Sequence, residues 1–235
     1  MCVMCSERDG RDLTTGSIPR HLIAFAVPML VGNVLQALYS LVNAFWVGKY
    51  LGPREMAAVT DIFPVFFVLM ALAIGLTMAA SILASQSYGA RDFVRLREVV
   101  ENSVVLVGIT SIACAGLSHF FAEPMLRLMH TDPDVLPIAV SYLRVFIWSM
   151  PFMFGMFLMS SLLRGVGDSR TPVVFQSIFL VVNAVLDPIL MFGWLGLPRM
   201  GVNGTAVATL ISMFGSIVSI LFDLKRKDHL VMPRL

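Results

Sequence analysis

Residues 62–90 read IFPVFFVLMALAIGLTMAASILASQSYGA and contain no Asp, Glu, Lys or Arg. This stretch is longer than the ~20 residues that an α-helix needs to cross the hydrocarbon core of a bilayer. Five further stretches resemble it, four without any charge and the last with only Asp187; they are residues 21–48, 102–122, 145–163, 200–222 and 171–198. Backbone polar groups cannot stay unpaired in lipid, so helices are expected. The sequence therefore predicts an all-α membrane protein with six transmembrane helices.

The composition excludes most other classes of protein. Of the 235 residues, 57% are hydrophobic and 14% are charged, and the mean hydropathy is +0.83. A soluble domain carries about 25% charged residues. The net charge of +2 gives no basic footprint, so no nucleic-acid partner is expected. No phosphate-binding loop, nucleophile motif or cluster of metal ligands is present, so we expect neither an enzyme nor a cofactor.

The connections between the stretches predict the orientation in the membrane. With the N-terminus inside, most of the 17 Lys and Arg residues fall in the inner connections and tails. Cytoplasmic connections carry the excess of basic residues, so both termini are expected in the cytoplasm of a multi-pass cell-membrane protein. The expected division is a cytoplasmic tail over 1–16, the six-helix transmembrane lobe over 17–224 and a cytoplasmic segment over 225–235.

Asp187 is the most informative polar residue inside a predicted span. A carboxylate in a membrane helix is costly and must face a cavity or a partner, or stay protonated. Asn183 lies one turn before Asp187 and Gln176 lies further along the same face, within roughly 40° at about 100° per residue. We therefore predict a proton or cation site at Asp187. The alternatives are a structural hydrogen bond or an aspartate at the water interface.

Two other predicted helices carry polar faces of the same kind. Small hydroxyl residues also allow close helix packing, which is the alternative interpretation of the face in 200–222. If the three helices are neighbours, polar residues in their outer halves converge at one level with Asp187. The face in 21–48 consists of Asn33, Gln36, Tyr39, Ser40 and Asn43, and the face in 200–222 consists of Thr205, Thr209, Ser212, Ser216 and Ser219.

Six short motifs together resemble the multidrug and toxic compound extrusion (MATE) family. Their order and spacing carry the resemblance, which covers residues 13–227. The motifs are IAFAVP at 23–28, VGKYLG at 47–52, QSYGA at 86–90, LRGVGD at 163–168, NAVLDP at 183–188 and GVNGTAVAT at 201–209.

The resemblance implies a transporter that exports organic cations in exchange for H⁺ or Na⁺, built from two six-helix lobes in the membrane lipid. This chain resembles the N-terminal lobe, with 225–235 as the start of the linker between lobes. The expected partner is a C-terminal half or a second copy.

The resemblance also implies roles for individual residues. Asn183 and Asp187 match an ion-binding pair, Tyr39 matches a nearby aromatic residue, and Pro28 matches a proline at which the first helix bends. Asn43 stands where many members carry a carboxylate. An amide cannot titrate, so we expect Asp187 to carry the coupling to H⁺, or to bind Na⁺, by itself.

Two other interpretations remain open at this point. One is a lobe of a lipid-linked saccharide flippase of the same superfamily, although the predicted spans hold no Lys or Arg for a pyrophosphate group. The other is a truncated, inactive fragment.

Overall fold

The computed structural model describes residues 18–193 and 199–226, and in these ranges the chain forms helices and no strand. The elements are α1 (Ile18–Trp46), the π-helical η2 (Val47–Leu51), α2 (Pro53–Asp61), α3 (Phe63–Gly89), α4 (Phe93–Leu128), α5 (Leu136–Phe146), the 3₁₀ turn η3 (Ile147–Ser149), α6 (Met150–Gly165), α7 (Arg170–Phe192) and α8 (Val202–Arg226).

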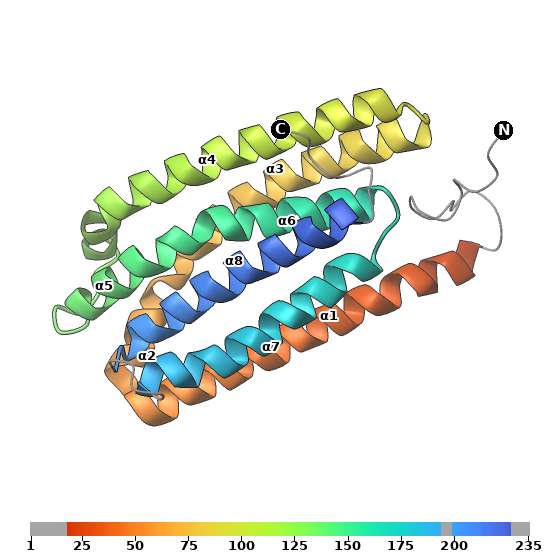
Figure 1. The fold of residues 1–235 in the computed structure, drawn as a ribbon. Helices are drawn as coiled ribbons and strands as arrows, with labels where there is room; N and C mark the ends of the chain where they lie inside the picture. The colour runs from red at the N-terminus through yellow and green to blue at the C-terminus, as the bar shows by residue number, and fades with distance from the viewer. Residues whose placement is uncertain (1–17, 194–198, 227–235) are drawn as a thin grey trace.

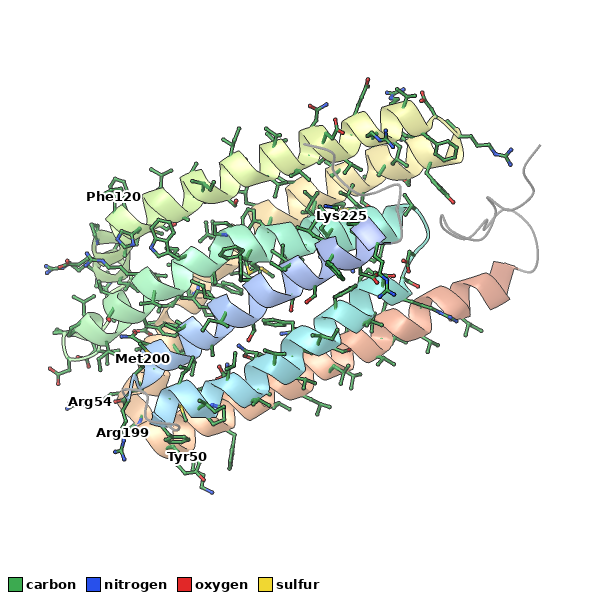
Figure 2. All side chains as sticks on the ribbon, in the orientation of Figure 1. Tyr50, Arg54, Phe120, Arg199, Met200 and Lys225 are labelled. Atoms are coloured by element: carbon green, nitrogen blue, oxygen red, sulfur yellow. The ribbon has the colours of Figure 1, made fainter. Side chains whose placement is uncertain are left out.

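Six helical stretches among the described residues are long and apolar enough to cross a membrane, which confirms the predicted fold class. Apolar side chains cover the outside of the bundle; Phe120, for example, is 81% exposed and projects away from α4 (Figure 2). Such a surface suits lipid rather than water. The protein is therefore a multi-pass helical membrane protein.

The fourth span begins earlier than the sequence suggests. We expected it at 145–163, but the helix begins at Leu136 and runs through α5, η3 and α6 to Gly165. Arg144 is exposed, so one charge at the helix surface does not end the helix. Pro151 stands in the first turn of α6, where its missing N–H costs nothing, and the 3₁₀ turn joins the two helices just before it.

The third span is also longer than the predicted 102–122. Asp92 caps α4 by accepting a hydrogen bond from the backbone N–H of Arg95 at 3.0 Å, so the basic stretch that follows forms the first turns of the helix. The 36 residues of α4 span ~54 Å at ~1.5 Å per residue. The hydrocarbon core is only ~30 Å thick, so α4 extends beyond it.

The helices lie roughly along one direction, with α3 and α4 at one edge, α1 and α7 at the opposite edge and α6 and α8 between them (Figure 1). α7 packs against both α1 and α8, whereas α1 packs chiefly against α7. The start of α1 and the end of α8 lie at the same end of the bundle, as six spans require (Figure 1).

Close backbone contact fixes the position of α8 on α7. A Cβ atom added to Gly204 would lie 2.8 Å from the carbonyl carbon and oxygen of Leu190. Glycine is therefore the residue that lets the start of α8 approach the end of α7, as small residues do between membrane helices.

Parts of the predicted domain division lie outside the described residues, namely 1–16 and 227–235. Lys225 and Arg226, which we assigned to the linker, form the last turn of α8. Basic residues are favourable there because the C-terminus of a helix carries a partial negative charge.

Candidate ion site between α1, α7 and α8

Asp187 and Asn183 face the interior of the bundle from α7. Asp187 is 4% exposed and Asn183 is fully buried. Pro188 follows Asp187 inside the helix and lacks the N–H that would bond to the carbonyl of Ala184. The polar end of α7 is thus surrounded by protein rather than lipid, which is where a carboxylate within a span is tolerated.

α1 brings Tyr39 into contact with both of these side chains. The Tyr39 hydroxyl donates a hydrogen bond to Asn183 Oδ1 and lies 3.3 Å from Asp187 Oδ2. Asn43 lies one turn further along α1, and its Nδ2 donates to the Tyr39 hydroxyl oxygen at 3.3 Å. Tyr39 therefore links the two helices at the level of the carboxylate.

α8 closes the other side of the cluster. Asn183 Nδ2 lies 3.5 Å from both Thr209 Oγ1 and Ser212 Oγ. The Thr209 hydroxyl also donates to the carbonyl of Thr205 at 2.9 Å. Asn183 thus bridges α1 and α8, with its oxygen toward Tyr39 and its nitrogen toward the hydroxyls.

Thr205 joins the cluster through a residue that the sequence analysis did not single out. The Tyr142 side chain, on α5, lies near Thr205 and Asp187. The signal was weak, since Tyr142 lies between Ser141 and Arg144 rather than inside a continuous apolar stretch. It was missed because the predicted fourth span began at 145, after this residue.

The remaining polar residues of the predicted faces separate into two groups. Gln176 Nε2 donates to Gln36 Oε1 at 3.3 Å, a second polar contact between α1 and α7, and Ser216 is buried. Asn33, Ser40 and Ser219 are exposed. Pro28 lies within α1, and its side chain is outside those that the structure describes.

One oxygen of Asp187 makes the cluster suited to hold a proton or a cation. Among the described residues, Asp187 Oδ1 is buried and has no hydrogen-bond partner. A buried carboxylate oxygen without a partner is costly. A proton on the carboxylate or a cation beside it removes that cost, and the surrounding groups are the oxygen donors that hard cations prefer.

A buried polar cluster between α1, α7 and α8, in a chain with six helices that can span a membrane, defines a multi-pass membrane protein with an internal site, the class to which solute transporters belong. The MatE family model matches residues 28–189, and the chain belongs to this family. Its members are transporters and not enzymes.

Two relatives show the extent of the similarity. The probable multidrug resistance protein YoeA of Bacillus subtilis is 37% identical over 213 residues, which are 91% of this chain and 46% of YoeA. The FAD transporter of Shewanella oneidensis is 27% identical over 205 residues, 87% of this chain and 45% of that protein. The chain spans about half the length of the curated relatives it matches.

Solved structures match in the same way. The crystal structure of MATE in the straight conformation superposes with a TM-score of 0.85 at 29% identity, over 95% of this chain and 49% of that one. A MOP superfamily transporter from Pyrococcus furiosus gives a TM-score of 0.86 at 29% identity, over 95% and 48% of the two chains.

Proposed function

We propose that this chain is one six-helix lobe of an exporter that moves organic cations out of the cell in exchange for H⁺ or Na⁺. The names of several relatives, such as the multidrug export protein MepA of Staphylococcus aureus, support drug efflux as the activity. The coverage of about half of each relative supports a role as one lobe that acts with a second lobe. In this proposal the lobe sits in the inner or plasma membrane with both termini in the cytoplasm.

The observation that carries the proposal is the buried Oδ1 of Asp187, which has no partner within the described part of the chain and lies beside Asn183 and Tyr39. Asp187 is the one carboxylate of this cluster, because Asn43 supplies an amide. When a single cation binds to or leaves Asp187, the charge beside Tyr39 changes by one. The contact between α1 and α7 then depends on whether the site is occupied. Thr205 and Thr209 complete the set of oxygen groups in this proposal, and Pro28 serves as the hinge of α1.

Ion binding by the purified chain tests this proposal directly. In detergent, we expect the chain to bind ²²Na⁺ or to take up one proton per molecule. Asp187→Asn should weaken that binding at least roughly tenfold, since the carboxylate supplies the charge of the site. The matched control is Asp61→Asn, which makes the same change at the end of α2.

The result has a clear interpretation only if the variants fold. Elution as a single species and an unchanged helical circular dichroism spectrum establish this for both. Ion binding by Asp187→Asn that equals that of the unaltered chain would refute the coupling role of Asp187.

A further inference from the structure

α1 is attached to the lobe by polar contacts at two levels. The first is the contact of Tyr39 with Asn183 and Asp187. The second lies one turn earlier on α1, where Gln176 Nε2 donates to Gln36 Oε1 at 3.3 Å. Among the described residues, these two levels hold the side-chain hydrogen bonds between α1 and α7.

Gly32 lies directly beside the contact of Gln36 with Gln176. A Cβ atom at position 32 would lie 3.4 Å from Gln176 Oε1 and 3.6 Å from a methyl group of Val173. Gly32 is itself buried. The glutamine amide therefore fits against the backbone of α1, one turn before its partner Gln36.

The two contacts share one face on each helix. At about 100° per residue, Gly32, Gln36 and Tyr39 fall within roughly 60° of one another on α1. Gln176, Asn183 and Asp187 fall within roughly 40° on α7 by the same arithmetic. Both helices run in the same direction (Figure 1), so a shift or rotation of α1 that breaks the amide pair also moves Tyr39.

Apolar contacts in lipid give little preference for one register, because a sliding helix exchanges one set of apolar neighbours for another. A polar pair is satisfied in one register only, as a single buried amide is in coiled coils. We infer that Gln36 and Gln176 are positioning residues that set the height and rotation of α1 on α7, so that the Tyr39 hydroxyl falls beside Asn183 and Asp187.

The pair of Gln36 and Gln176 has a property that the contact of Tyr39 with Asn183 and Asp187 lacks. Glutamine amides do not titrate and carry no charge, so this contact does not itself gain or lose a proton or a cation. The consequence for ion binding rests on the proposed function, whereas the register of α1 does not. The two are therefore measured separately.

The register is measured by the distance between spin labels on Val34→Cys of α1 and Val174→Cys of α7, both exposed positions, in a full chain whose three native cysteines are replaced by alanine. We expect Gln36→Met and Gln176→Met each to broaden or shift the distance distribution. The double variant should be no worse than either single variant, because the two residues act as one pair. The matched control is Gln86→Met, at an exposed glutamine of α3.

Binding of ²²Na⁺ or of protons is measured on the same variants. We expect affinity to fall about threefold to tenfold in each glutamine variant of the pair, the size of one interhelical hydrogen bond in a membrane, and to stay unchanged in Gln86→Met. Unchanged distance distributions in both single variants, or effects that add in the double variant, would overturn the inference. A chain that binds no ion but loses its register in the Gln36 and Gln176 variants would refute the ion site and support the positioning role.

Discussion

Asn43 decides how many titratable carboxylates the candidate site contains. Its Nδ2 donates to the hydroxyl oxygen of Tyr39, which leaves the hydroxyl proton of Tyr39 for Asn183 and Asp187. An amide at this position thus orients the tyrosine without competing for a proton. At the scale of single residues, the site holds one carboxylate among neutral hydrogen-bonding groups.

Asn43→Asp adds a second carboxylate next to Tyr39. Two carboxylates in one enclosed site resist ionising together, so we expect the variant to retain a shared proton to higher pH than the unaltered chain. The pH at which ²²Na⁺ binding reaches half of its maximum should therefore move upward. The matched control, Asn102→Asp, makes the same change at an exposed position of α4 and should leave this pH unchanged.

A binding curve for Asn43→Asp that overlays that of the unaltered chain at every pH would show that position 43 lies outside the ion site. Both substitutions keep the size of the side chain, so we expect both variants to fold like the unaltered chain.

At the scale of helices, the contact between α7 and α8 places the hydroxyls of α8 beside Asn183. Thr209 and Ser212 reach Asn183 on the same two helices whose backbones approach closely at Gly204. The backbone of Leu190 cannot move aside as a flexible side chain can. Glycine at 204 thus couples the packing of two helices to the geometry of the site.

Gly204→Ala should force α8 away from α7. We expect a loss of stability of about 1–3 kcal/mol, the usual cost of overpacking, seen as a lower melting temperature in detergent, together with weaker ion binding. Gly215→Ala is the matched control on the same helix, where a Cβ atom meets nothing within 4 Å. Because alanine favours helix more than glycine does, that variant should be as stable as the unaltered chain or more stable. Equal melting temperatures for the two variants would contradict the close contact.

At the scale of the whole molecule, the basic residues indicate which side of the membrane each end of the bundle faces. Lys225 lies toward one end of the bundle, and Tyr50, Arg54 and Arg199 lie at the other (Figure 2). The turns after α3 and α6 lie at the same end as Lys225 and carry further arginines, such as Arg91 and Arg170 (Figure 1). The positive-inside rule then predicts that this end faces the cytoplasm.

Reporter fusions measure this orientation in cells. A fusion after Lys227 should report the cytoplasm, and a fusion between Arg199 and Met200 should report the outer side, because one span separates the two sites. Fusions that report the same side, or a C-terminal fusion that reports the outside, would contradict the proposed topology.

The sequence by itself determined the number and type of the spans and the polar faces on three of them. Insertion into a membrane depends on local hydropathy, which a stretch such as 62–90 carries without reference to any other part of the chain. Helix ends were less predictable: Arg144 suggested a boundary, yet the helix continues past it because a single charge at the surface is easily accommodated.

Only the tertiary structure decided which of the polar faces meet. α7 lies between α1 and α8, so Asn183 contacts Tyr39 on one side and Thr209 on the other, and Gln36 pairs with Gln176. Tyr142 joins the cluster from α5, a helix that local charge had assigned to a loop. Hydropathy cannot encode these partners, because every apolar helix surface is equally compatible with lipid. The choice among neighbours is made by close approach at small residues and by polar pairs between segments far apart in the chain.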